Sequence, residues 1–275
     1  MDCYNCSSQE NTYYSEENGF TLVKCSGCGL LYVQNPPGLA EISKAHTQGL
    51  HRGEKAIEVT GRYSPTTVRR FSSVLKDLFE DGLDGNIRWL DVGCGHGEFI
   101  EALQRFTPHS IQVIGSEPNT HKQESAKSRG LDVRFIDLDS HQATYDYISL
   151  LNVYSHLPNP VEFLAKLKEL LRPNGELVIE TGDTANLPAA DHYRPFCLPD
   201  HLSFASEKIV TDVLKRLGFE IVLVRKYPFM ELTGITFAKE FAKLFVPGYT
   251  SRLLPLVSSG KKYSQTDMYI RARRI

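Results

Sequence analysis

Three glycines at alternate positions are the most informative feature of the sequence: Gly93, Gly95 and Gly97. They lie within residues 90–99, which read as the end of a buried strand, a tight turn and the start of a helix. Glycine lacks a Cβ and tolerates positive φ, so such a turn lets the backbone approach a ligand closely. The helix that follows presents unpaired N–H groups to that ligand.

Two carboxylates accompany this turn. Asp91 lies two positions before the first glycine, and Glu117 follows the last by about the interval at which nucleotide-binding α/β domains place a ribose-binding carboxylate. The dinucleotide-binding fingerprint has its third glycine where this chain has Glu98. A carboxylate beside the turn suits a cationic or hydroxyl-bearing ligand better than a pyrophosphate, which it would repel. The sequence therefore predicts a nucleoside-cofactor site that is not built for a dinucleotide.

At these residues the chain resembles the class I S-adenosylmethionine-dependent methyltransferases, including the small-molecule, benzoquinol-methylase-like enzymes. The resemblance continues in chain order through Glu117, Asp137 and residues 152–160 and 171–177. It implies that S-adenosylmethionine binds at the glycine turn and that Glu117 accepts hydrogen bonds from the ribose hydroxyls. It also implies that Asp137 lies near the adenine amino group, and that Asn152 lies where the amino-acid portion of the cofactor meets the acceptor. For Glu117 and Asp137 the alternative is a solvated carboxylate at the end of a strand or in a loop.

Four of the six cysteines form two C-x2-C pairs separated by eighteen residues: Cys3, Cys6, Cys25 and Cys28. This spacing predicts a zinc site. Four thiolates leave no open coordination position, so the predicted zinc is structural and not catalytic. A segment this short has too little core to fold unaided, and the metal would supply the missing stability. Two disulfides or unligated thiols are the alternatives.

Strand and helix patterns alternate from residue 64 onward, which predicts an α/β fold with a mostly parallel sheet and helices on both faces. The expected strands are 87–92, 111–116, 132–136, 145–151, 176–181, 219–225 and 266–273, and the expected helices are 97–106, 119–129, 160–172 and 206–217. The resemblance implies a Rossmann-like sheet of seven strands whose last strand is antiparallel. We expect a zinc ribbon at 1–34, a linker or lid at 35–63 and a methyltransferase domain at 64–275 with insertions at 182–205 and 226–265. The second insertion could pack as an extra helix, cover the active site or bind a partner.

Composition fits an ordinary soluble enzyme of 275 residues, with 41% hydrophobic residues and a net charge of −2. No apolar run approaches the ~20 residues of a membrane span, and the N-terminus lacks the pattern of a signal peptide. We therefore expect a cytoplasmic protein with reduced cysteines and no membrane partner. The first 34 residues contain one Lys and no Arg, so the predicted ribbon is a poor surface for nucleic acid.

Two histidines are candidates for the general base that a hydroxyl or an acidic carbon needs before it accepts a methyl group. His156 lies in an element similar to one common in small-molecule methyltransferases, and its alternative role is to shape the pocket. His201 follows Asp200 in a segment that resembles the deoxysugar C-methyltransferases, which also carry an N-terminal zinc-binding segment. That resemblance implies that Asp200 and His201 belong to the active site, and a neighbouring carboxylate raises imidazole basicity where the side chains converge. The alternative for His201 is a contact at the N-terminus of the helix that follows Ser206.

These features predict an S-adenosylmethionine-dependent methyltransferase that acts on a small polar acceptor such as a sugar or a glycan. One alternative is an RNA methyltransferase that holds its substrate with the zinc ribbon. The other is a non-catalytic binding module on a methyltransferase scaffold. The sequence leaves open the acceptor, the oligomeric state and whether carbon, oxygen or nitrogen receives the methyl group.

Overall fold

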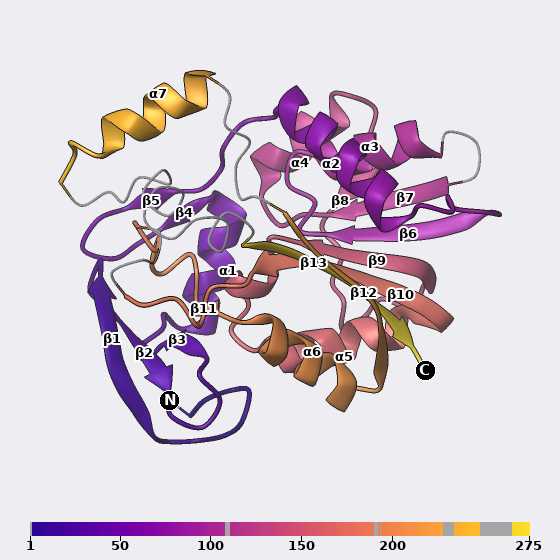
Figure 1. The fold of residues 1–275 in the computed structure, drawn as a ribbon. Coiled ribbons are helices and arrows are strands. Elements are labelled where there is room, and N and C mark those ends of the chain that lie inside the picture. The colour runs from indigo at the N-terminus through magenta and orange to yellow at the C-terminus, as the bar shows by residue number, and fades with distance from the viewer. Residues whose placement is uncertain (1, 108–110, 190–191, 193, 228–233, 248–265) are drawn as a thin grey trace.

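The computed structural model describes residues 2–107, 111–189, 192, 194–227, 234–247 and 266–275 (Figure 1). No helix in these ranges is long and apolar enough to span a membrane.

A seven-stranded sheet forms the centre of the molecule, in the strand order β12-β13-β10-β9-β6-β7-β8. Its strands are β6 (Ile87–Val92), β7 (Ile111–Ser116), β8 (Val133–Arg134), β9 (Tyr145–Leu151), β10 (Leu171–Gly182), β12 (Phe219–Tyr227) and β13 (Asp267–Arg274). The pairs from β10 through β9, β6, β7 and β8 are parallel, whereas β13 runs antiparallel to both β10 and β12. The predicted Rossmann-like sheet with an antiparallel last strand is confirmed. The chain leaves β6 for β7 on one side and returns to β9 on the other, which opens a crevice at the carboxyl ends of β6 and β9.

Helices cover both faces of this sheet, as the alternating pattern predicted (Figure 1). One face carries α2 (Pro65–Leu78), α3 (Glu98–Phe106) and α4 (Thr120–Lys127), and the other carries α5 (Pro160–Leu170) and α6 (Glu207–Arg216). Successive strand residues point to opposite faces. Trp89 of β6 therefore packs with α2 and α3, whereas Leu90 packs in the cluster that includes α5 and α6.

Predicted and observed element boundaries agree closely, with two clear exceptions. β10 begins at Leu171, five residues before the expected strand at 176–181 and within the helix expected at 160–172. The strand expected at 132–136 is reduced to Val133–Arg134. The amide of Ile136 donates to the Ser116 side chain at 3.2 Å, so it leaves the main-chain ladder. Phe135 is 62% exposed, and a strand residue facing water contributes little to the sheet.

The predicted ribbon lies in a second, four-stranded antiparallel sheet in the order β1-β2-β3-β11. The residues around the second cysteine pair predict short strands at 20–24 and 30–33, which correspond to β2 (Phe20–Cys25) and β3 (Leu31–Val33). The strands β1 (Asn11–Glu17) and β11 (Ser203–Phe204) were not expected. The fourth strand comes from the predicted insertion at 182–205, so the sheet joins the N-terminal segment to a loop about 170 residues later in the chain. Leu22 and Leu31 share a buried cluster with Phe196 and Leu198 from that insertion.

The segment 35–63, expected as a linker or lid, contains a helix and two short strands. These are α1 (Leu39–Gln48), β4 (Leu50–His51) and β5 (Ile57–Glu58). The helix buries Ile42 and Ala45, one turn apart on one face, and ends at Gly49 in the left-handed conformation. Because most residues of this segment are polar, its sequence pattern did not indicate this narrow apolar face.

The predicted insertion at 226–265 lies largely outside the described residues. Its described part contains α7 (Gly234–Lys243), in line with the helical spacing of its aromatic residues. Phe241, Leu244 and Phe245 are 50%, 41% and 74% exposed. The role of this insertion remains a prediction.

Candidate active site

A cavity of about 570 Å³ lies at the crevice between β6 and β9. It is lined by the glycine turn after β6, the acidic end of β7, the loop after β8 and the segment after β9. Seven residues were predicted to bind the cofactor, and all but Gly97 line this cavity. The six are Asp91, Gly93, Gly95, Glu117, Asp137 and Asn152. The carboxyl ends of neighbouring parallel strands thus bring together residues that are up to 61 positions apart in the chain.

The glycine turn needs glycine for conformation and for space. Gly93 and Gly97 have φ values of 69° and 87°, a region that other residues rarely adopt. A Cβ on Gly93 would lie 2.4 Å from the Val153 side chain, and one on Gly97 would lie 2.4 Å from Leu131. Gly97 therefore packs the turn against α4 and does not face the cavity.

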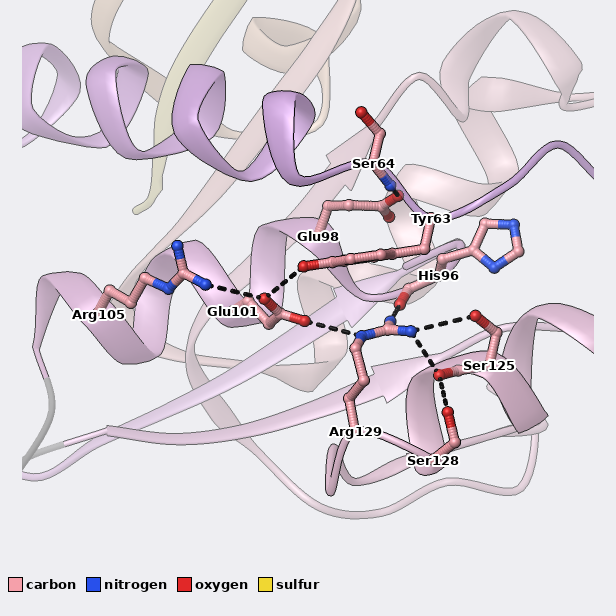
Figure 2. Close-up of polar contacts among 9 residues, drawn as sticks. All are labelled: Tyr63, Ser64, His96, Glu98, Glu101, Arg105, Ser125, Ser128 and Arg129. Atoms are coloured by element: carbon pink, nitrogen blue, oxygen red, sulfur yellow. Dashed lines mark hydrogen bonds and ion pairs between the residues drawn. The ribbon is translucent and has the colours of Figure 1, made fainter.

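Arg129 fixes the outer side of this turn (Figure 2). Its guanidinium donates to the main-chain oxygen of His96 within the turn and to Glu101 Oε1 at 2.8 Å. It also stacks 3.9 Å from the ring centre of Tyr63, whose hydroxyl donates to Glu101 Oε2 at 2.9 Å. A planar group with several donors suits such a junction better than lysine would. The start of α2, the helix α3 and the end of α4 are thereby held around the glycine turn.

Glu117 lies inside the cavity with its carboxylate already oriented by the backbone. Oε2 accepts from the amide of Gly95 and Oε1 from the amide of Asn119, both at 2.9 Å. The residue is 5% exposed. Each oxygen retains capacity for a further hydrogen bond, so the carboxylate can receive two adjacent hydroxyls.

Asp91 is the most deeply buried acid of the cavity, with 1% exposure. The Ser149 hydroxyl donates to Asp91 Oδ1 at 2.6 Å, and the indole N–H of Trp89 donates to Ser149 at 2.9 Å. Burial raises the pKa of Asp91 to about 7, against the opposing effect of the Ser149 hydrogen bond. A cationic ligand group beside it would stabilise the ionised form.

The other two predicted cofactor residues lie at the rim. Asp137 is exposed and accepts from the amide of Asp139 and the hydroxyl of Ser140, at 3.1 and 2.9 Å. Asn152 is exposed and has a positive φ of 56°, with its amide donating to the main-chain oxygen of Glu180 at 3.1 Å. Asn152 therefore ends β9 in a turn that points the chain along the edge of the cavity.

Asp200 and His156 converge at the far end of this cavity. His156 Nδ1 hydrogen-bonds the main-chain oxygen of Asp200 at 2.9 Å and lies 3.1 Å from its Oδ1. Burial would lower the pKa of His156, but the Asp200 charge and hydrogen bonds raise it above the ordinary value. The carboxyl pKa of Asp200 is lowered, since the effect of His156 outweighs burial. The sequence paired Asp200 with its neighbour His201, which lies within 4.8 Å of the carboxylate, but His156 Nδ1 and His51 Nε2 both lie closer, at 3.1 Å.

His201 lies on the other side of His156, with ring centres 4.7 Å apart. Its Nδ1 shares a hydrogen bond of 2.7 Å with the main-chain oxygen of Phe196. Burial and then the charge of His156 lower its pKa to about 4, the opposite of the increase expected from adjacency to Asp200. At neutral pH this imidazole is uncharged.

A second cavity, of about 260 Å³, adjoins the first, and Asn152 lines both. His201 lines the second cavity, and His156 lines the first. Glu180 also lines the second cavity. Burial and, as a smaller effect, the charge of nearby Asp267 raise the pKa of Glu180 to about 8. The direction of this shift favours the protonated carboxyl, which can donate a hydrogen bond. Arg194 of the 182–205 insertion lines the same cavity.

The four paired cysteines converge at the start of the N-terminal sheet. The Sγ atoms of Cys3 and Cys28 are 3.6 Å apart, and those of Cys6 and Cys25 are 3.4 Å apart. All four lie within 4.8 Å of one another and none forms a disulfide. Sulfur atoms bound tetrahedrally to zinc at about 2.3 Å lie about 3.8 Å apart, so this arrangement fits the ion.

Two histidines that were not among the predicted site residues lie close to the pair formed by Asp200 and His156. His46 of α1 and His51 of β4 lie beside Asp200, and their ligand atoms lie within 4.8 Å of one another. They belong to the segment expected as a linker, where no periodic pattern marks them. Only the folding of that segment onto the insertion brings them to the site.

A family model described as "Methyltransferase domain" matches residues 63–224, more than half of the chain. The chain belongs to this methyltransferase-domain family, and its sheet order and glycine turn are those of the class I S-adenosylmethionine-dependent fold.

Individual relatives cover parts of the chain. The ubiquinone biosynthesis O-methyltransferase of Aeromonas salmonicida is 26% identical over 134 residues, which are 45% of this chain and 55% of that protein. The tRNA U34 carboxymethyltransferase of Chromohalobacter salexigens is 38% identical over 152 residues, covering 50% of this chain and 45% of that protein. The chain thus spans about half the length of these curated relatives. The crystal structure of an S-adenosylmethionine-dependent methyltransferase from Archaeoglobus fulgidus aligns with a TM-score of 0.52 at 20% identity, covering 75% of this chain and 94% of that chain, and shows the shared fold.

Proposed function

We propose that this protein transfers a methyl group from S-adenosylmethionine to a small polar acceptor, such as a sugar or a glycan, and that a structural zinc holds its N-terminal sheet. The observation that carries the proposal is the oriented carboxylate of Glu117 beside the glycine turn, in a cavity at the switch point of a class I sheet. S-adenosylmethionine, when bound, supplies an electrophilic methyl group on a sulfonium. Asp91 then faces its cationic amino-acid portion and Glu117 its ribose.

The second cavity is the proposed acceptor site. It meets the cofactor cavity at Asn152, where the methyl group would cross. Its wall combines the donors of Glu180 and Arg194 with the ring of His201, which suits an acceptor rich in hydroxyl or carbonyl oxygen. Positioning acceptor and methyl in line is the main catalytic task.

His156 is the proposed general base. Its Nδ1 is engaged by Asp200, so Nε2 is the nitrogen that takes the acceptor proton. The acceptor oxygen or carbon then forms its bond to the methyl group, the bond from methyl to sulfur breaks, and the electron pair stays on sulfur. Asp200 acts by orienting the imidazole, and His201 by contacting the acceptor.

Replacing Glu117 by alanine tests the cofactor proposal. Wild-type protein is expected to bind S-adenosylhomocysteine in calorimetric titration, and the variant to bind at least about tenfold more weakly, a loss of about 1.4 kcal/mol. Glu124→Ala, which removes an exposed glutamate from α4, is the matched control and should bind like wild type. Absence of binding by the wild-type protein would contradict the proposal and favour the non-catalytic module.

The affinity for S-adenosylhomocysteine is expected to rise with pH between 6 and 8. Burial raises the pKa of Asp91 to about 7, and a cationic ligand group favours its ionised form. Binding below this pKa therefore releases a proton, so affinity increases by up to about tenfold per pH unit and levels off above pH 7 to 8. Titration of wild type and Asp91→Asn across this range measures the difference. An equal slope in both proteins would remove Asp91 from the ligand-binding role.

Turnover measured with different classes of acceptor distinguishes the proposed function from RNA methylation. A relative named for tRNA modification matches half of this chain, but the N-terminal sheet offers one Lys and no Arg within residues 1–34. Turnover with nucleotide sugars or glycans and not with RNA would support the proposal, and the reverse would replace it.

A further inference from the structure

A group of imidazoles beside Asp200 has no function in the reaction described above. His46 comes from the last turn of α1 and His51 from β4, and each reaches Asp200 on the loop before β11. One nitrogen of each histidine and one oxygen of Asp200 lie within 4.8 Å of one another. The adjoining elements α1 and β4 thus meet a loop about 150 residues later in the chain.

The two imidazoles are incompletely satisfied. Among the described residues, neither His46 Nε2 nor His51 Nε2 has a hydrogen-bond partner, although both atoms are buried. His51 is 2% exposed, and its Nε2 lies 3.1 Å from Asp200 Oδ1 without the angle of a hydrogen bond. A buried polar atom without a hydrogen-bond partner is energetically unfavourable. Two such imidazole nitrogens in a group that also contains a carboxylate indicate that a further ligand completes the site.

Residues other than His46 and His51 hold the backbone of Asp200 in place. The amide of Asp200 donates to the main-chain oxygen of Cys197 at 2.9 Å, and His156 Nδ1 bonds the main-chain oxygen of Asp200. Both contacts fix the turn that carries the side chain. Supporting contacts of this kind are typical around metal ligands.

We propose that His46, His51 and Asp200 bind a divalent first-row transition ion such as zinc. Two imidazole nitrogens and one carboxylate oxygen suit Zn²⁺, Fe²⁺ or Ni²⁺, whereas Mg²⁺ and Ca²⁺ prefer oxygen ligands. Ligand atoms held by one such ion at about 2.0–2.2 Å lie about 3 to 3.5 Å apart, and His51 Nε2 and Asp200 Oδ1 already lie 3.1 Å apart. This site is separate from the cysteine cluster.

Three protein ligands leave a coordination position open. His46 and Asp200 both line the cofactor cavity, so the open position faces it. A doubly charged ion beside a single carboxylate retains positive charge and attracts an anionic or polarised oxygen. Resting on the proposed methyl transfer, this position takes an acceptor oxygen that reaches from the second cavity past Asn152 into the cofactor cavity.

The metal content of the full chain tests the site without cofactor or acceptor. Protein loaded with Zn²⁺ alone and desalted is expected to hold two ions per chain by elemental analysis, one at the cysteines and one at the histidines. Loading with Co²⁺ distinguishes them, because thiolate-bound cobalt gives charge-transfer absorption that a histidine–carboxylate site lacks. Since this count needs no bound S-adenosylhomocysteine, failure of the metal site and failure of the proposed function are separately visible.

Variants assign the ion to its ligands. His51→Gln and Asp200→Asn are expected to lose one ion while keeping the cobalt–thiolate absorption. If these variants fold poorly, His46→Ala tests the same site, because His46 is only half-buried and its replacement disturbs the fold less. His141→Ala is the control, since His141 instead contacts the Tyr145 hydroxyl at 2.7 Å. The proposal is overturned if wild type holds only the cysteine-bound ion, or if the second ion persists in His46→Ala and His51→Gln.

Discussion

Replacing His156 by glutamine is expected to lower kcat by about 10²–10⁴-fold, the range that a positioned general base contributes. Glutamine retains a group that can hydrogen-bond the Asp200 main chain but accepts no proton at this step. The rate of single turnover with saturating S-adenosylmethionine measures the effect on the acceptor that screening identifies. Titration with S-adenosylhomocysteine should show that the cofactor site remains intact.

Two comparisons make this result specific. His201→Gln is expected to raise KM for the acceptor more than it lowers kcat, because His201 lines the second cavity and not the first. His141→Gln, outside both cavities, should behave like wild type. A larger loss of kcat in His201→Gln than in His156→Gln would exchange the two assignments.

Loss of the proposed structural zinc is expected to open the N-terminal sheet. In Cys25→Ser, or after chelation of wild type, amide exchange in β1 to β3 should accelerate by about 100-fold or more, about 2.8 kcal/mol of local stability. Zinc contributes about 10–16 kcal/mol to isolated zinc-finger peptides, but here the buried Leu22 and Leu31 retain part of the sheet. Hydrogen exchange followed by mass spectrometry gives the protection of each strand.

The same experiment reports on the active site through β11. Exchange should also accelerate near Ser203 and Phe204, which pair with β3, and turnover should fall because Asp200 precedes them on the same loop. Thr12→Ser is the control, since Thr12 is an exposed residue of β1 outside the cysteine cluster and both cavities. Unchanged zinc content in Cys25→Ser, or undisturbed exchange in β2 and β3, would contradict the zinc assignment.

Local patterns were sufficient to predict most of the central sheet and its cofactor crevice. Buried strands with β-branched residues, capping serines such as Ser64 and Ser206, and a glycine turn each act within a few residues. Because parallel strands end at one edge, the acidic residues after β6 and β7 had to meet there. The cofactor-site residues are therefore close together in space, while their individual roles remain predictions.

Contacts between distant segments were not predictable in the same way. β11 has two residues and forms only because β3 offers an edge, so its own sequence carries no signal. His201 lies close to Asp200, as its position in the chain suggested, but the contacts of Asp200 with His156 and His51 come from other segments and could not be predicted. His46 and His51 gained a site only through the packing of α1 and β4.

The pairing of β3 with β11 also sets an order of events during synthesis. The strands at residues 11–33 leave the ribosome early, but their edge partner at 203–204 follows about 170 residues later. Until then the edge of β3 is open to pairing with other chains. The edge of β3 in a nascent chain therefore needs protection, by a chaperone or by rapid synthesis of the rest of the chain, until β11 pairs with it.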